Sequence, residues 1–273
     1  MQPGANEFII PHVSPAKPQP LSSPRIREIE AKSILTPSRI PGMDYALNPY
    51  VGCAHACAYC YVRAMQRFFH HQGERWGSFI DIKRNAPYLL LRELGRRKKG
   101  RVLLASATDC YQPLEKKVGL TRACLEILAD ARASVSIITK SALIVRDLDL
   151  LRRVDDLSVG LTITTDDDRV RRTLEPGASA IPARFDALAR LKQAGLNPHV
   201  FVGPILPMSP EKLAARLDPL AAFVYLDRMN YHWLAGSLLR GRGWDMALDP
   251  AYADQVIETF RRLLGPERVE AIC

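Results

Sequence analysis

The stretch NPYVGCAHACAYCYVRA, residues 48–64, brings Cys53, Cys57 and Cys60 close together in the sequence. The whole chain of 273 residues has six cysteines, so half of them stand in this one segment. Thiolates in proteins select zinc ions or iron-sulfur clusters. The segment therefore predicts a metal centre, and the number of available ligands bears on which kind it is.

Three neighbouring cysteines leave two kinds of centre open. A structural zinc ion takes four protein ligands, usually in two pairs, and this chain offers no second cysteine pair. A Cys3His zinc site would need a histidine as its fourth ligand, and the nearby candidates are His55, His70 and His71. A four-iron cluster held by three cysteines instead leaves one iron with an open coordination position. An open position usually indicates a catalytic rather than a structural metal centre.

The composition is that of an ordinary globular protein, with 47% hydrophobic and 25% charged residues. This length suits one large α/β domain. No run approaches the roughly 20 apolar residues of a membrane span, and the N-terminus lacks the pattern of a signal peptide. We therefore expect a cytoplasmic protein without membrane contact. In a reducing compartment, closely spaced cysteines are metal ligands or catalytic groups rather than a disulfide framework.

The chain is basic, with a formal net charge of +9 and a pI near 9.4. Lysine and arginine concentrate in residues 92–101, 169–172, 240–243 and 261–268. Such clusters favour an anionic partner such as nucleic acid. Solvated helix ends and loops explain the same clusters equally well, so both interpretations stay open.

The pattern of residues along the chain divides the sequence into two regions. Residues 1–44 carry eight prolines and little periodicity, which predicts an irregular Pro-rich leader before a core domain at 45–273. In the core, apolar β-rich runs alternate with helical ones, as in βα units with a parallel sheet. The predicted strands are 45–50, 101–107, 134–141, 157–165, 197–207 and 221–227. The predicted helices are 119–132, 142–154, 182–194, one from 209–210 and 251–264.

About six such units fit either an open doubly wound sheet or a partial barrel. In both, ligands gather at the C-terminal ends of the strands. Polar residues follow the predicted strands at Ser106, Thr108 and Asp109, at 139–141, and at 164–166. The cysteines follow the first strand of the core, so we expect them on the same rim.

The segment CAHACAYCY matches CxxxCxxC, with Tyr59 just before the last cysteine, and resembles the cluster loop of the radical S-adenosylmethionine (radical SAM) superfamily. Further motifs occur in order: SATDCYQPLE, ITKSALIVRDLDLL, RRTLEPGA and VGPILP. Together they resemble proteins related to spore photoproduct lyase, often labelled DNA repair photolyases. The resemblance covers roughly residues 40–265.

The resemblance implies a partial (β/α)6 TIM-like barrel with a [4Fe-4S] cluster ligated by Cys53, Cys57 and Cys60. The amino and carboxylate groups of S-adenosyl-L-methionine (SAM) would chelate the fourth iron. Reduction would then split SAM into methionine and a 5′-deoxyadenosyl radical, which abstracts a hydrogen atom from the substrate. A reductant protein such as flavodoxin or ferredoxin is expected as a partner.

The resemblance also assigns SAM contacts on two strand ends. Ser106, Thr108 and Asp109 match the position that holds the amino group, where a carboxylate would face an ammonium. Alternatively, Asp109 caps a turn. Lys140 and Ser141 match a position that holds the carboxylate or ribose, unless Lys140 reaches solvent instead.

Further SAM contacts are implied deeper in the barrel. Thr162 and Thr164 alternate on one strand face and would meet the ribose, or they are packing residues. Gly203 would allow close backbone approach to the adenine, and Tyr59 would present backbone groups to the same ring.

The hydrogen-donating cysteine of spore photoproduct lyase falls on Ala107 in this sequence, and Cys110 lies three residues beyond. Either Cys110 is a displaced donor or this loop has none. We therefore predict the radical SAM reaction class rather than DNA repair, acting on an unidentified substrate for which nucleic acid is one candidate. A peptide or small metabolite is an alternative substrate, and a non-enzymatic Cys3His zinc or nucleic-acid-binding protein is an alternative of another class.

Two segments contain aromatic and basic residues that could line a substrate entrance, namely 65–77 and 230–244. Core packing explains their large aromatic side chains just as well. The residues in question are Phe68, Trp76, Trp233 and Trp244.

Overall fold

A computed structural model describes residues 23–272, and its main feature is a curved eight-stranded sheet. The strand order is β11-β10-β9-β8-β7-β6-β3-β2. Neighbours from β3 to β11 run parallel, and β2 pairs antiparallel with β3. The strands are β2 (Leu35–Pro37), β3 (Tyr45–Leu47), β6 (Arg101–Leu104), β7 (Ser134–Thr139), β8 (Leu157–Thr162), β9 (His199–Val202), β10 (Phe223–Asp227) and β11 (Val269–Ile272).

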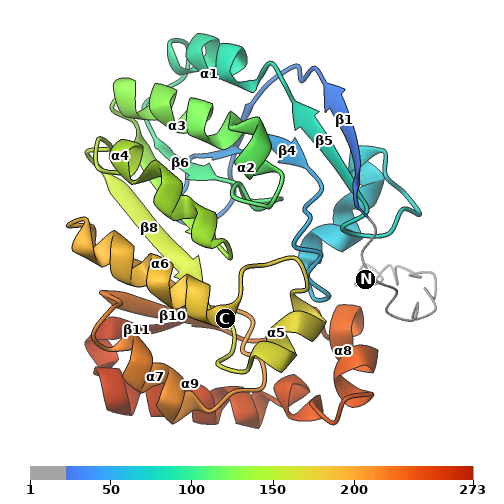
Figure 1. The fold of residues 1–273 in the computed structure, drawn as a ribbon, viewed down its shortest axis with the longest axis vertical. Helices are drawn as coiled ribbons and strands as arrows, with labels where there is room; N and C mark the ends of the chain where they lie inside the picture. Colours follow the sequence, from blue (N-terminus) through green and yellow to red (C-terminus); the bar gives the residue numbers. More distant parts are fainter. Residues whose placement is uncertain (1–22, 273) are drawn as a thin grey trace, which may run out of the picture.

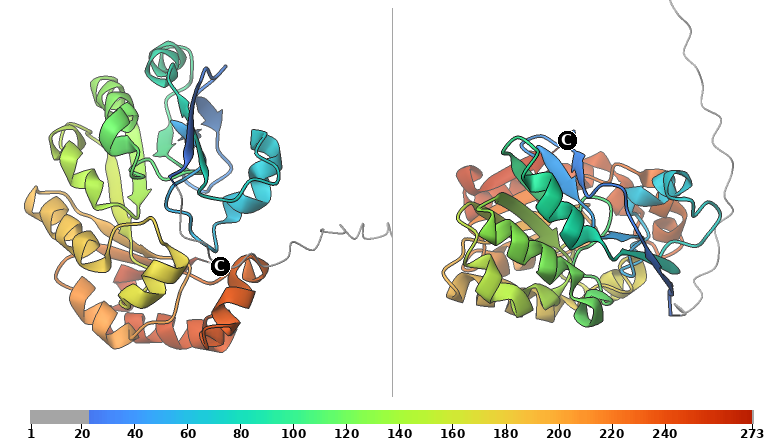
Figure 2. Two further views of the ribbon diagram at one scale, coloured as in Figure 1. Left: turned by 45° about the vertical axis from the view of Figure 1, so that its right-hand side comes forward. Right: turned by 90° about the horizontal axis from the view of Figure 1, so that it is seen from above.

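Helices follow the strands, and most of them lie on the outer side of the curved sheet (Figure 1, Figure 2). The α-helices are α1 (Ala86–Leu94), α2 (Glu115–Val118), α3 (Leu120–Asp130), α4 (Leu148–Leu151), α5 (Asp168–Leu174), α6 (Ile181–Gln193), α7 (Pro210–Leu217), α8 (His232–Arg240) and α9 (Pro250–Leu264). The 3-10 helices are η1 (Tyr61–Phe69), η2 (Ala142–Asp147), η3 (Asp245–Leu248) and η4 (Pro266–Arg268). None of the helices in the described part of the chain combines the length and apolar character that a bilayer span requires.

The main core lies between the sheet and these helices. Val135 and Ile137 of β7 are fully buried and share one apolar cluster with Leu128 of α3 and Leu188 of α6. Because side chains alternate along a strand, every second residue of β7 faces this layer. Burial of apolar area at about 25 cal/mol per Å² makes this layer the main stabilising contribution.

The alternation of strands and helices predicted from the sequence is confirmed from β3 to β10. The sheet curves into an arc, so the partial-barrel alternative is the correct one (Figure 2). The predicted helix at 142–154 is divided into η2 and α4. Strand β11 extends the parallel order by one position, and sequence reasoning missed it because VEAI is a short run after a long helix.

A second sheet, with strand order β1-β5-β4, lies beside the barrel and corrects the expected irregular leader. Its strands are β1 (Arg25–Ile29), β5 (Phe79–Lys83) and β4 (Tyr50–Val51). Strand β1 pairs parallel with β5, where Arg27 binds Asp81 through two hydrogen bonds of 2.8 and 2.7 Å. Strand β2 also falls in the expected leader. The partner of β1 is about fifty residues away, so local sequence gave no sign of it; residues 1–22 of the leader lie outside the described residues.

Candidate active site

The three cysteines lie on a tightly turned loop that leaves β4. Cys53 and Cys57 are buried and Cys60 is half-buried. The backbone N–H of Ala56 donates to the Cys53 carbonyl, and that of Cys60 to the Cys57 carbonyl, each at 3.2 Å. Gly52 has a φ of +84°, and a Cβ there would lie 2.3 Å from a backbone oxygen. Only glycine meets both conditions, so the loop can turn directly after the strand.

Burial makes these thiols hard to ionise. It raises the pKa of Cys53 to about 12 and also raises the pKa of Cys57 and Cys60. The Lys140 ammonium partly opposes this effect at Cys57. Iron or another cation supplies the positive charge that holds such sulfurs as thiolates. The loop therefore has the donor set of a metal centre, and a [4Fe-4S] cluster with one open iron fits its three thiols.

The segment after β6 fastens this loop from one side. The Thr108 hydroxyl donates to the Gly52 carbonyl at 2.7 Å. The Gln112 side-chain oxygen accepts from the Ala54 backbone N–H at 2.8 Å. These bonds explain Thr108 and Gln112 in the second motif, whose side chains reach the cysteine loop rather than solvent.

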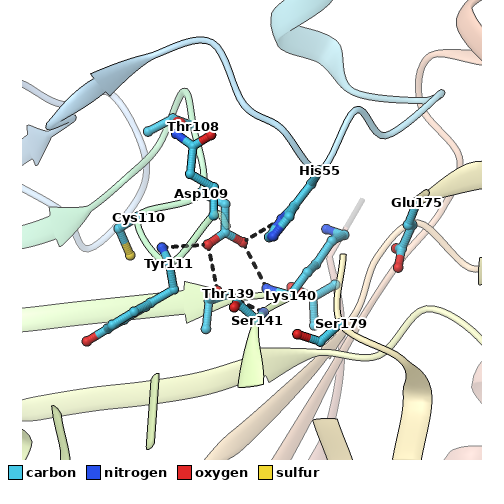
Figure 3. Close-up of polar contacts among 12 residues, drawn as sticks. His55, Thr108, Asp109, Cys110, Tyr111, Thr139, Lys140, Ser141, Glu175 and Ser179 are labelled. Atoms are coloured by element: carbon cyan, nitrogen blue, oxygen red, sulfur yellow. Dashed lines mark hydrogen bonds and ion pairs between the residues drawn. The ribbon is translucent and has the colours of Figure 1, made fainter. Parts of the chain in front are cut away.

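Asp109 joins three parts of the site through one buried carboxylate (Figure 3). Its Oδ1 accepts from the Tyr111 backbone N–H at 2.9 Å and from the Thr139 hydroxyl at 2.6 Å. Its Oδ2 accepts from the Lys140 backbone N–H at 2.9 Å and lies 3.3 Å from His55 Nδ1. Burial alone would raise the pKa of this carboxyl, but His55 and the hydrogen bonds hold it below its usual range.

The position of Asp109 bears on both of its predicted roles. The bond from Tyr111 is the turn cap that sequence reasoning offered as the alternative. A SAM ammonium would have to bind a carboxylate that already has four partners. The SAM role of Asp109 stays a prediction, together with those of Ser106 and Thr108.

The histidines near the cysteines have other partners. His55 faces Asp109, and His71 lies between Glu74 at 2.7 Å and Asp81 at 2.8 Å. Across residues 23–272, no group of three His, Cys, Asp or Glu side chains is arranged to hold a single metal ion. The positions of His55 and His71 count against the Cys3His zinc alternative.

A second buried network lies beneath the loop and is centred on Glu175. Its carboxylate accepts from the Thr164 hydroxyl at 2.8 Å and from the hydroxyl of Tyr59, and it pairs with the buried Arg184. Burial opposes ionisation of Glu175, but Arg184, the Lys140 ammonium and the hydrogen bonds lower its pKa to about 2. The Lys140 Nζ lies 5.6 Å from the Tyr59 ring centroid. The structure therefore brings together Tyr59, Lys140 and Thr164, around a carboxylate that sequence reasoning left without a role.

The end of α5 and the residues that follow it form the floor of the cysteine loop. The Ala58 N–H donates to the Leu174 carbonyl at 2.8 Å, and the Gly177 N–H to the His55 carbonyl at 3.1 Å. A Cβ on Gly177 would lie 1.9 Å from the Ala54 carbonyl oxygen. The motif RRTLEPGA was the signal for this contact, but its partner could not be named from sequence.

The remaining predicted SAM residues have local roles. The Ser141 hydroxyl accepts from the Leu143 N–H at 3.2 Å and caps η2. Thr162 is buried, and its backbone carbonyl accepts from Arg184 at 2.9 Å. Gly203 is also buried, beside the side chain of Phe201. Contacts of these residues with SAM stay predictions.

Cys110 is completely buried and belongs to the main core cluster, as does Cys124. Its sulfur points away from Asp109 and His55 (Figure 3). Burial raises the pKa of this thiol well above its usual value. A hydrogen donor must reach the substrate, so the structure favours the alternative in which this loop contains no donor.

The basic run at 169–172 is largely neutralised by neighbouring acids. Arg169 pairs with Asp167 at 3.0 Å, and Arg171 and Arg172 pair with Asp168 at 2.9 and 2.8 Å. This cluster therefore fits the interpretation of a solvated helix end better than that of a nucleic-acid surface.

The aromatic residues of the two proposed entrance segments divide evenly. Trp76 is buried and Trp244 is packed against a core cluster. Phe68 and Trp233 are instead 64% and 58% exposed. Core packing thus explains the first two, and the other two are available for contact with a ligand.

The cysteine loop and the strand ends around it lie within a part of the chain that matches a known protein family. The family described as the radical SAM superfamily matches residues 47–218. The chain belongs to the radical SAM superfamily. The matched region includes the cysteine loop, the Asp109 and Glu175 networks and strands β6 to β9. The protein is therefore an enzyme of this superfamily.

Relatives of this radical SAM enzyme come from archaea, bacteria and phage. An uncharacterized protein of Methanocaldococcus jannaschii is 36% identical over 207 residues, covering 75% of this chain and 78% of that protein. An uncharacterized protein of Mycobacterium tuberculosis is 30% identical, and this chain covers 66% of its length, just under two thirds. A radical SAM Nalpha-GlyT isomerase of Pseudomonas phage M6 is 25% identical, with 82% of this chain and 44% of that protein covered.

The fold of this radical SAM enzyme is that of spore photoproduct lyase. The structure of that lyase in complex with dinucleoside spore photoproduct has a TM-score of 0.65. The superposition covers 90% of this chain and 81% of the lyase, at 15% sequence identity. The likeness establishes the partial barrel.

Proposed function

We propose that Cys53, Cys57 and Cys60 hold a [4Fe-4S] cluster whose open iron binds SAM. When bound, the reduced cluster supplies the electron that splits SAM into methionine and a 5′-deoxyadenosyl radical. The observation that supports this role is the loop itself, which holds its three thiols in place with bonds from two separate segments. Superfamily membership supplies the reaction class.

The surrounding residues would position and shield the centre. Burial of Cys53 and Cys57 excludes water from two of the three sulfurs. Lys140 provides a positive charge beside Tyr59, where it can attract the SAM carboxylate. The Glu175 network below fixes Tyr59, so that the loop keeps one shape while SAM binds and leaves.

Radical SAM enzymes require an electron source, and we propose a flavodoxin or ferredoxin. Nucleic acid is our first candidate substrate. The net charge of +9 and the exposed Phe68 and Trp233 support it, because phosphates attract basic surfaces and bases stack on aromatic rings. A peptide or a small metabolite is the alternative.

Anaerobic reconstitution with iron, sulfide, SAM and a strong reductant tests the reaction class. Wild-type protein should form 5′-deoxyadenosine, detected by chromatography, and Cys57→Ala should form none and lose the broad visible absorption of the cluster. Cys124→Ala is the matched control, since this buried thiol lies in the core and should leave the absorption unchanged. A full complement of iron and sulfide in Cys57→Ala would refute the ligand assignment.

A further inference from the structure

A pocket of about 300 Å³ opens beside the cysteine loop, between residues 36–40, the 3-10 helix η1 and the segment after β6. One wall is Tyr61, which directly follows Cys60 and donates from its hydroxyl to the Ser106 carbonyl at 2.5 Å. Another is Asn48, whose amide donates to the Ser106 hydroxyl at 3.1 Å. The pocket therefore shares residues with the predicted reaction site and has the size of a small-ligand site.

The charged residues that line this pocket are positive. They are Lys83, half-buried at the end of β5, and Arg39, and the part of the chain that the structure describes contributes no Asp or Glu to the lining. Within residues 23–272, neither side chain has a hydrogen bond or an ion pair. Burial lowers the pKa of Lys83, because removal from water disfavours the charged form of this side chain.

The other walls favour a flat ring with an anionic substituent. Tyr61 and Phe69 provide aromatic surface. The Ser106 hydroxyl already accepts from Asn48 and keeps its own hydrogen to donate. A phosphate or carboxylate near Lys83 would gain charge-assisted hydrogen bonds and would give this ammonium the partner that residues 23–272 do not supply.

We propose that this pocket binds an aromatic anion, a planar ring carrying a phosphate or carboxylate group, with Lys83 as its principal cation. Under the proposed function, on which this inference rests, this anion is part of the substrate. The location places the ring along Tyr61 and so next to the cysteine loop. Lys83 acts here as a binding residue for the substrate.

Direct binding to the reconstituted protein tests this assignment without any turnover. The probes are 4-nitrophenyl phosphate, 4-nitrobenzoate and the neutral 4-nitrobenzyl alcohol, titrated under anaerobic conditions by calorimetry. The Kd of at least one anion should rise tenfold or more in Lys83→Met and stay within threefold in Lys83→Arg. Lys212→Met, which removes an exposed charge from α7, is the matched control and should bind as the wild type does.

The stronger of the two anions tells a phosphate site from a carboxylate site. Because Lys83 lies within a strand, Arg39→Met offers a second variant at an exposed position, and it should weaken the same anion severalfold. Equal affinity of wild type and Lys83→Met, equal affinity for the neutral alcohol, or no anion binding would each overturn the proposal. Iron content and deoxyadenosine formation, measured on the same preparations, report separately whether the proposed function fails.

Discussion

Single side chains in this site act as connectors between segments that are distant in sequence. Asp109 illustrates this role, because its carboxylate contacts His55 in the cysteine loop and Thr139 at the end of β7. Both contacts are buried, where hydrogen bonds to a charged group contribute more than exposed ones. The residue that the superfamily resemblance assigns to SAM thus also holds the protein scaffold together.

Removing the charge of Asp109 should therefore reduce stability. Asp109→Asn keeps the shape but weakens the bonds from Thr139 and Lys140 and the pairing with His55, which should lower the free energy of unfolding by about 2 kcal/mol. Urea denaturation of the anaerobic protein measures this quantity. Asp130→Asn is the control, since Asp130 pairs with Arg153 at an exposed position and should cost less than about 1 kcal/mol. Similar losses for both variants would contradict the connecting role.

The sequence indicated several residues that the structure brings together near the cysteine loop, but not the groups that they contact. Spacing and resemblance led to Cys53, Asp109 and Lys140, because metal-loop and strand-end positions are local patterns. The partner of Glu175 could not be predicted, since Arg184 and Tyr59 meet it only after three separate segments have packed together.

Two segments determine the shape of the cysteine loop, one after β6 and one formed by the end of α5 and the residues that follow it. The second makes its contact through backbone atoms, with Ala58 bound to Leu174 and His55 bound to Gly177. Such a contact needs close approach of two backbone segments, which any side chain on Gly177 would prevent. The geometry of the cysteine loop therefore depends on a glycine about 120 residues away in sequence.

Gly177→Ala should impair cluster binding although it removes no ligand. The added Cβ would lie 1.9 Å from the Ala54 carbonyl oxygen, so the loop must shift. We expect the iron and sulfide content after reconstitution to fall by at least half. Gly95→Ala provides the control, because a Cβ there meets nothing within 4 Å. Full cluster content in Gly177→Ala would show that the floor contact is dispensable.

The elements themselves were predictable to different degrees. Strands such as β7 and helices such as α6 are long and strongly patterned, and they occur where the sequence predicts them. The small sheet was missed because β1 and β5 are stabilised by each other across a long separation. The helix expected from 209–210 is α7; Ser209 precedes it without a side-chain capping bond, and its backbone N–H donates to Asp166 at 2.8 Å.

Across the whole molecule, stability should depend on pH through a histidine at the beginning of β9. His199 is buried, its ring lies against Gly160 and Tyr225, and burial lowers its pKa from 6.5 to about 4. The folded protein therefore keeps this ring neutral, and the unfolded chain takes up its proton first as the pH falls. The stabilisation is complete above pH 6.5 and is lost as the pH falls towards 4.

Between pH 7 and about pH 5.5, this effect should lower the free energy of unfolding by about 1 kcal/mol. The comparison is between wild type and His199→Gln by urea denaturation at each pH, under anaerobic conditions. His199→Gln should lose less stability over this interval, and the exposed His70→Gln should follow the wild type. The same slope in all three proteins would rule out His199 as the source.

The cysteine loop is held by hydrogen bonds to four residues outside it, namely Thr108, Gln112, Leu174 and Gly177. Much of the conformational entropy of this loop is therefore lost when the protein folds rather than when a cofactor binds. For the cluster proposed above, we therefore expect oxygen damage to leave the protein loop folded. We also expect that iron and sulfide can then be reloaded without refolding the chain.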